Sequence, residues 1–343
     1  MNAPVAEAAA RVLRVLGTGG TIAGRAASAH DAVGYQAGVL PVHALLEGLP
    51  RPAGWTVQAR QVFNIDSKDM SAGHWRALLD EVDAALAEPA VGAVLVTHGT
   101  DTLEETAWLL QAALAPAKPV VLTGAMRPAS ALAPDGPQNL MDALVLATDE
   151  RLQAGGGVWV TLAGRVFDAA SVRKVHPMRL DAFAGGDAGP VAWVEGGQVR
   201  WLAGLPVQPP VAVARLAPQQ WQRAPWPRVE WITSHAGADG ALVRALLLQH
   251  RAAQSGAVAE APLRGLVVAG TGNGAVHAAL AEALGQAQAE GVEVWLTTRC
   301  AEGRVVVADS GGRAAQRWNV CPLPPAKARV ALLLHLLQRD ATG

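Results

Sequence analysis

The chain has 343 residues, half of them apolar, which is enough to bury the cores of two domains. Its 28 basic and 29 acidic residues form no basic run, so the charge favours neither a nucleic acid nor a membrane surface as partner. Cys300 and Cys321 form no Cys-x-x-Cys pair, no apolar run could span a bilayer, and the first residues lack a secretion pattern. We expect a cytoplasmic globular protein with a small neutral or zwitterionic ligand.

A glycine-rich turn follows the first predicted strand. Residues 12–16 indicate a buried strand of a parallel sheet, and residues 17–20 let the backbone turn sharply at its carboxyl end, where open α/β sheets bind ligands. A nucleotide cradle is the common alternative, but the dinucleotide pattern needs Gly or Ala where Ile22 stands, and the P-loop sequence is absent. Thr21 is therefore a candidate nucleophile, with a purely structural turn as the other interpretation.

A predicted loop at residues 25–38 is rich in Ala, Ser and Gly and has no helical or strand period. It carries Tyr35, the only tyrosine of the chain. This side chain is either an ordinary surface aromatic or the hydroxyl of a lid that swings over the strand end.

A polar cluster ends the second predicted strand, Trp55–Ile65. Asp66 and Ser67 lie in this cluster, between the strand and a helix that begins near Ser71. Side chains at this position commonly cap the helix, and they can also line a strand-end site.

The third predicted strand, Val91–Thr97, leads into a loop with two polar residues that no helix cap requires. Thr102 and Glu105 predict a capping box for the next helix. Thr100 and Asp101 are not needed by that box. They lie where a strand end meets a helix N-terminus, which suits the binding of a carboxylate or an oxyanion.

Strands and helices go on alternating, which predicts a doubly wound α/β fold. We predict an N-terminal α/β domain over residues 1–205, a proline-rich linker over 206–227 that continues no helix or central strand, and a smaller C-terminal α/β domain over 228–343. Lys174 is a lone lysine in an uncharged neighbourhood. The later predicted strands are at 119–123, 156–162, 165–167, 229–233, 265–269 and 292–298, and the later helices at 137–149, 239–253, 275–290 and 326–339.

Residues 270–275 match the dinucleotide spacing Gly-x-Gly-x-x-Gly/Ala between a predicted strand and helix. The acidic residue for the ribose belongs at the end of the next strand, whereas Glu293 stands at its start, so the match is weak. No His-Glu-x-x-His occurs, and His98 has no partner at ligand spacing, so we interpret it as a structural hydrogen-bonding residue. We expect neither a metal nor another cofactor.

The polar residues of the strand-end loops comprise hydroxyls, one acid and one amine. A hydroxyl becomes a good nucleophile when a base takes its proton, and a lysine buried beside a threonine can do so because burial lowers its pKa. This chemistry suits acyl transfer from an amide. The set consists of Thr21, Ser67, Thr100, Asp101 and Lys174, with Tyr35 on its loop.

Three segments resemble the bacterial-type L-asparaginases: Thr-Gly-Gly-Thr-Ile-Ala-Gly at 18–24, Thr-His-Gly-Thr-Asp-Thr-Leu-Glu-Glu-Thr at 97–106, and Lys-Pro-Val-Val-Leu-Thr-Gly-Ala-Met-Arg-Pro at 118–128. The first two are signatures of that family, and similarity continues over nearly the whole chain. The resemblance implies an enzyme that hydrolyses L-asparagine to L-aspartate and ammonia. It also implies a flavodoxin-like N-terminal domain.

The resemblance further implies a role for each candidate residue. Thr21 is the nucleophile, Tyr35 the lid hydroxyl, and Thr100, Asp101 and Lys174 the supporting group. The base that activates Thr21 stays open.

Substrate contacts also follow from the resemblance. Ser67 holds the α-carboxylate, Asp101 binds the ammonium, and the Ala125 carbonyl faces the side-chain amide, while backbone N–H groups near Thr21 and Thr100 stabilise the oxyanion. Asn273 reaches the site of a neighbouring subunit. The substrate-binding residues so implied are Asp66, Ser67, Thr100, Asp101, Ala125 and Asn273.

The family pattern implies a homo-oligomer, a tetramer built from dimers with shared sites. Asp66 and Lys68 stand where well-known secreted members have glycine and glutamine, so the asparagine-to-glutamine preference stays open. Two alternatives remain: a broader glutaminase-asparaginase, and a non-catalytic protein that binds an amino acid or a dinucleotide.

Overall fold

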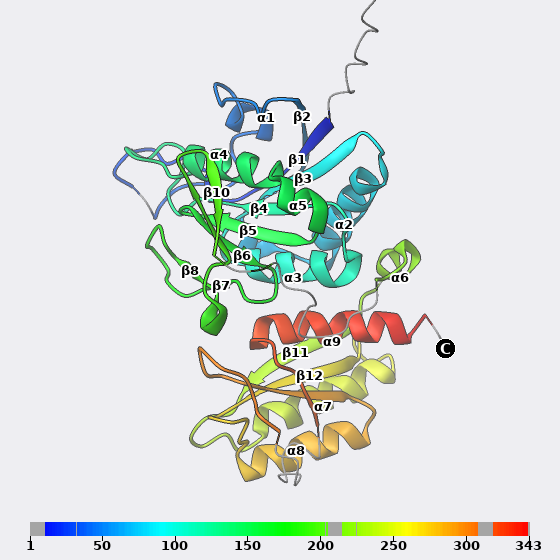
Figure 1. The fold of residues 1–343 in the computed structure, drawn as a ribbon. Helices are drawn as coiled ribbons and strands as arrows, with labels where there is room; N and C mark the ends of the chain where they lie inside the picture. Colours follow the sequence, from blue (N-terminus) through cyan, green and yellow to red (C-terminus); the bar gives the residue numbers. More distant parts are fainter. Residues whose placement is uncertain are drawn as a thin grey trace, which may run out of the picture. The chain divides into compact units, whose positions relative to one another are not determined.

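The computed structural model describes residues 11–31, 33–202, 204, 215–223, 225–307 and 318–341. The chain divides into two compact units, Met1–Pro206 and Val207–Gly343, each with its own main β-sheet (Figure 1). None of the helices in the described ranges is long and apolar enough to cross a membrane.

The main sheet of the first unit has the order β10-β9-β6-β5-β4-β3-β1-β2. The strands β2, β1, β3, β4 and β5 are parallel in the order of flavodoxin-like folds, which confirms the predicted doubly wound sheet. β6, β9 and β10 extend it by antiparallel pairing that the sequence did not predict. The strands are β1 (Arg11–Gly19), β2 (Trp55–Ile65), β3 (Val91–Thr97), β4 (Val120–Thr123), β5 (Val158–Leu162), β6 (Arg165–Asp168), β9 (Ala192–Glu195) and β10 (Gln198–Trp201).

The register of the parallel strands aligns their carboxyl ends. Gly17 of β1 pairs with Thr97 of β3, and Thr97 pairs in turn with Thr123 of β4. The loops that leave these strands therefore start side by side. The strand order reverses between β1 and β3, so their two loops flank the switch point at which such sheets bind ligands.

Helices cover both faces of this sheet (Figure 1). α4 packs on the face that carries Leu13 and Val15. α2 and α3 are joined by a hydrogen bond of 3.0 Å from Trp75 Nε1 to Thr106 Oγ1. The predicted apolar stripe of α2 is buried, as helical spacing requires. The helices are α1 (Val42–Leu45), α2 (Ala72–Ala87), α3 (Leu103–Leu114), α4 (Gly136–Ala147) and α5 (Glu150–Gly155).

A small antiparallel ribbon, β7 (Arg173–Lys174) and β8 (Phe183–Ala184), lies between β6 and β9 in the chain. It gives Lys174 a fixed backbone position, because Lys174 pairs with Phe183, whose side chain is buried.

The second unit has a parallel sheet in the order β11-β12-β13-β14. Residues of α7 and α8 form a core with one face of this sheet, and α9 packs against β11, β12 and β13 (Figure 1). The elements are β11 (Arg228–Thr233), α7 (Ala241–Gln254), β12 (Leu263–Gly270), α8 (Ala278–Ala289), β13 (Glu293–Thr298), β14 (Asn319–Val320) and α9 (Pro325–Arg339).

The predicted linker at 206–227 lies in part outside the described residues. Its described part contains a short helix, α6 (Pro218–Gln222), in which the proline occupies the first turn, where its missing N–H is not needed. Trp221 and Trp226 are buried, and Trp226 Nε1 donates to Trp221 O at 2.7 Å. α6 also packs against α9, so this part of the chain belongs to the second unit.

Candidate active site

Thr21 begins a 3-10 turn, Thr21–Ala23, directly after β1. Gly20, at φ +80°, lies so close to the next strand-end loop that a Cβ there would collide with Gly99 Cα. Glycine thus allows the loops after β1 and β3 to touch. The Thr21 side chain is largely buried, and its Oγ1 lies 2.6 Å from the hydroxyl oxygen of Tyr35.

Tyr35 reaches Thr21 from the loop that follows this turn. Gly24 leaves room for the tyrosine ring, since a Cβ on Gly24 would lie 2.8 Å from Tyr35 Cδ2. The backbones of Arg25 and Gln36 pair on either side of the loop.

The surroundings of Tyr35 fix its protonation state. Burial raises its pKa above the ordinary value of 10.0, the hydrogen bond with Thr21 lowers it, and the negative charges of Asp66 and Asp101 raise it further. Tyr35 is therefore a neutral phenol at neutral pH.

Thr100, Asp101 and Lys174 form a second contact group. Lys174 Nζ donates to Thr100 Oγ1 at 2.8 Å and to Asp101 Oδ1 at 2.6 Å. The Lys174 backbone N–H also donates to Glu104 Oε2, at 2.5 Å. Thr100 is buried, whereas more than half of the Asp101 side chain is exposed at 54%. The amine thus lies between a buried hydroxyl and a solvent-facing carboxylate.

Ser67 is buried and contacts the segment that carries Thr100 and Asp101. Its Oγ accepts a hydrogen bond of 3.2 Å from the Asp101 N–H, and its carbonyl accepts one of 2.8 Å from Thr102 Oγ1. The predicted capping box is therefore wrong, because the Thr102 hydroxyl is used to hold Ser67 and makes no cap bond to α3.

Asp66 caps the 3-10 turn Ser67–Asp69, and Ser71 with His74 caps α2. Lys68 Nζ, 60% exposed as a side chain, contacts Asp69 at 2.7 Å and Asp66 at 3.2 Å. These two carboxylates raise the pKa of Lys68. A charged cluster thus adjoins the buried Ser67.

Ala125 and His98 pack where the loops after β3 and β4 meet. Ala125 is fully buried, and Gly124 before it lies against His98 O, where a Cβ would be only 2.5 Å away. His98 Nδ1 lies 2.7 Å from Gly99 O, which can only accept, so Nδ1 carries the proton. Burial lowers the pKa of His98 to about 4, and the imidazole is neutral at pH 7. This geometry fits the structural role predicted for His98.

Asn273 lies in the second unit, in the loop after β12. Its Nδ2 donates to Val306 O at 2.9 Å, and its Oδ1 accepts from Val306 N at 2.7 Å. Both polar groups of this amide thus hold the loop after β13.

The glycine loop around Asn273 does not open a helix. Thr271 and Ala275 pair across it, and α8 begins only at Ala278 with His277 as its cap. This arrangement disfavours the dinucleotide alternative, which needs a helix N-terminus at the loop. Within the described part of the chain, no three His, Cys, Asp or Glu side chains gather as metal ligands would.

The structure thus brings together Thr21 with Tyr35, and Thr100 with Asp101, Lys174 and Ser67. Four residues that contact the site loops were not singled out from the sequence, because no local pattern marks them: Glu104, Ser130, Asp135 and Asn139.

Two family models cover most of the chain. The one described as "Asparaginase, N-terminal" matches residues 12–206, and the one described as "Glutaminase/Asparaginase C-terminal domain" matches residues 228–342. The chain belongs to the asparaginase family. The resemblance seen in three segments of the sequence is thereby confirmed.

Relatives of known name support this asparaginase-family assignment. "L-asparaginase 2" of Escherichia coli is 31% identical over 334 residues, covering 95% of this chain and 89% of the relative. "Probable L-asparaginase periplasmic" of Haemophilus influenzae is 32% identical over 337 residues, covering 95% and 88%. The crystal structure of "Probable Cytoplasmic L-asparaginase" from Campylobacter jejuni matches with a TM-score of 0.81 at 31% identity, over 95% of each chain.

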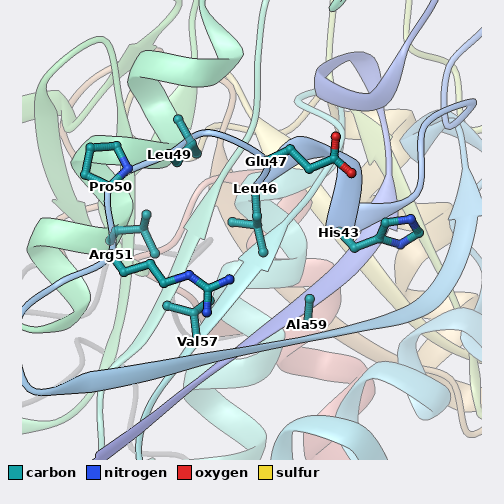
Figure 2. A pocket seen from close by; sticks show the side chains of 9 residues that line it. His43, Leu46, Glu47, Leu49, Pro50, Arg51, Val57 and Ala59 are labelled. Atoms are coloured by element: carbon teal, nitrogen blue, oxygen red, sulfur yellow. The ribbon is translucent and has the colours of Figure 1, made fainter.

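This asparaginase-family chain also has a surface pocket between α1, β2 and α4 (Figure 2). Leucines, a valine and an alanine form much of its wall, with charged side chains beside them. None of the lining residues belongs to the predicted site, so the pocket is separate from the strand-end group. It is lined by His43, Leu46, Glu47, Leu49, Pro50, Arg51, Val57, Ala59 and Leu144.

Proposed function

We propose that this asparaginase-family chain hydrolyses L-asparagine to L-aspartate and ammonia through a covalent ester on Thr21. The observation that most supports this is a pair of side-chain contacts in adjoining strand-end loops: Thr21 with Tyr35 at 2.6 Å, and Lys174 with Thr100 at 2.8 Å. The two loops touch through Gly20 and Gly99. A substrate amide bound between them would face hydroxyls from both sides.

In the proposed reaction, Thr21 Oγ1 attacks the side-chain carbonyl carbon of the substrate. The amide nitrogen takes a proton and leaves as ammonia, and water then releases aspartate from the ester. Backbone N–H groups of the loops at Thr21 and Thr100 stabilise the negative oxygen of the intermediate.

Tyr35 and Lys174 have different parts in this proposal. The neutral phenol of Tyr35 exchanges a hydrogen bond with Thr21 without placing a charge beside it. Lys174 Nζ donates to Thr100 Oγ1, so the hydroxyl hydrogen of Thr100 is left for another acceptor, such as the leaving nitrogen or the attacking water.

Substrate binding uses the groups around Ser67. In the proposal, Ser67 holds the α-carboxylate, Asp101 binds the ammonium, the Ala125 carbonyl faces the amide and Asp66 lies at the edge of the site. The exposure of Asp101 supports its part, because that carboxylate remains open to a ligand while it contacts Lys174.

We further propose a homotetramer built from dimers, in which Asn273 adjoins the site of a neighbouring subunit. Light scattering on the purified protein tests the mass of the assembly. We also propose a cytoplasmic location, which the name of the Campylobacter jejuni neighbour supports, although the Haemophilus influenzae relative is named periplasmic. Cell fractionation tests the location.

Ammonia release from L-asparagine, D-asparagine and L-glutamine tests the proposed activity. L-asparagine should give the highest kcat/KM, and Thr21→Ala should release no ammonia above background while it still binds aspartate. Equal turnover of L-glutamine would favour the broader glutaminase-asparaginase, which the name of the matching C-terminal family also mentions. Binding of an amino acid with no ammonia from any of the three amides would contradict the proposal.

A further inference from the structure

The loop after β4, residues 126–135, is closed by a single carboxylate. Asp135 accepts hydrogen bonds from the N–H of Met126 and of Arg127, both at 2.9 Å. Arg127 Nη1 also donates to Ala133 O at 3.1 Å, across the same loop. We call residues 126–135 the latch loop.

Asn139 of α4 ties this carboxylate to the end of β4. Its side chain is buried, and its Nδ2 donates to Asp135 Oδ2 at 3.1 Å and to Gly124 O at 2.9 Å. Its Oδ1 accepts from the Ala163 N–H at 3.0 Å. Ala125 lies between Gly124 and Met126. Asn139 therefore holds the residue before Ala125, and Asp135 holds the residue after it.

The latch loop also holds the loop that carries Tyr35. Three hydrogen bonds join the two loops: Ala129 N to Gly24 O at 3.0 Å, Leu132 N to Ala29 O at 3.3 Å, and Ala26 N to Ser130 Oγ at 2.8 Å. One loop therefore contacts both Ala125, on the proposed amide side, and the loop whose tyrosine touches Thr21.

We propose that Asp135 is a positioning residue that couples the place of the Ala125 carbonyl to the closed position of Tyr35. It acts by holding the latch loop in the conformation that contacts both Ala125 and the loop that carries Tyr35. This rests on the function proposed above. Hydrogen bonds to a charged group are among the strong ones, so weakening this contact should reduce kcat/KM by roughly 10- to 100-fold.

Asp135→Asn is the principal variant, because it keeps the size of the side chain. One Asp135 oxygen accepts the N–H of Met126 and the other accepts the N–H of Arg127. In the variant, either orientation of the asparagine amide places its NH₂ group against one of these N–H donors, so one of the two hydrogen bonds is lost. The matched control is Asp149→Asn. Asp149 also accepts two backbone N–H groups, at the start of α5, and contacts neither loop. Ser130→Ala removes only the contact between the latch loop and Ala26.

Fluorine NMR gives a readout of the lid that does not depend on turnover. Because Tyr35 is the only tyrosine, growth with 3-fluorotyrosine labels this one position. We expect one Tyr35 signal for the parent with aspartate bound, a displaced or broadened signal for Asp135→Asn, and a smaller change for Ser130→Ala. Asp149→Asn should keep both the parent signal and the parent kcat/KM.

The proposal is overturned if Asp135→Asn keeps kcat/KM within about twofold of the parent. It is also overturned if kcat/KM and melting temperature fall while the Tyr35 signal of the aspartate-bound protein is unchanged, since that result indicates a purely structural role. If the parent releases no ammonia, the proposed function fails, and the fluorine signals still decide whether Asp135 holds the lid.

Discussion

His98 is a fully buried imidazole at the contact of two strand-end loops, and its titration predicts how stability depends on pH. Burial lowers its pKa from 6.5 to about 4, and its hydrogen bond with Gly99 opposes this shift only in part. At a pH between these two pKa values, His98 is protonated in the unfolded chain but neutral in the folded chain. Unfolding free energy therefore falls as the pH falls, by about 1.4 kcal/mol per unit and about 3 kcal/mol in all.

The perturbation that tests this is His98→Asn, which keeps a nitrogen donor near Gly99 O. Urea unfolding followed by tryptophan fluorescence measures parent and variant from about pH 7 to about pH 4. The parent should be the more stable at pH 7, and its advantage should shrink by about 3 kcal/mol at the acidic end. His43→Asn removes an exposed histidine and serves as the control. If the difference in unfolding free energy between parent and His98→Asn stays constant with pH, His98 does not cause the pH dependence and the prediction is wrong.

Three further predictions concern the strand-end group. Lys174→Met keeps the length of the side chain but removes the donor to Thr100, so kcat should fall by roughly 10²-fold or more while aspartate affinity, measured by calorimetry, changes much less; a change in melting temperature alone would exclude the assigned role. Tyr35→Phe should lower kcat by about 10²-fold with an unchanged melting temperature, and an unaltered rate would make Tyr35 a surface residue. Gly20→Ala introduces a Cβ at φ +80° against Gly99, so both kcat and thermal stability should decrease, and a variant equal to the parent in both would contradict the loop contact.

Most of the parallel sheet of the first unit was predictable because four of its strands, β1, β3, β4 and β5, are buried on both faces, whereas β2 lies at the edge. Such strands appear in the sequence as unbroken apolar runs, as in Val91–Thr97, and the loops between them stand out by their polar residues. Thr21, Thr100 and Asp101 could be selected for that reason. The prediction of the site therefore depended on polar residues that stand at the ends of buried strands.

The antiparallel ribbons were not predictable in the same way. β7 and β8 have only two residues each, and β9 and β10 have four, with exposed positions among them. Segments this short show no clear period. The sequence marked Lys174 only as a lone lysine in an uncharged neighbourhood, and its role in the supporting group followed from the family resemblance.

Contacts between residues that are distant in the chain also could not be predicted from the sequence. Thr102 and Glu105 fit a capping box, yet the Thr102 hydroxyl bonds to Ser67 from another strand-end loop. The bond from Ser130 to Ala26 spans 104 positions and has no local signal. Tertiary partners compete with local ones for the same hydroxyl, and one sequence does not show which prevails.

Trapping the covalent intermediate tests whether Thr21 is the nucleophile. The enzyme is mixed with L-asparagine, quenched with acid within the first turnover and digested, and mass spectrometry then locates the acyl group among the peptides. We expect an aspartyl ester on Thr21 that is absent from Thr21→Ala. An ester on Thr100, or ammonia release by an enzyme that forms no ester at any time point, would contradict it.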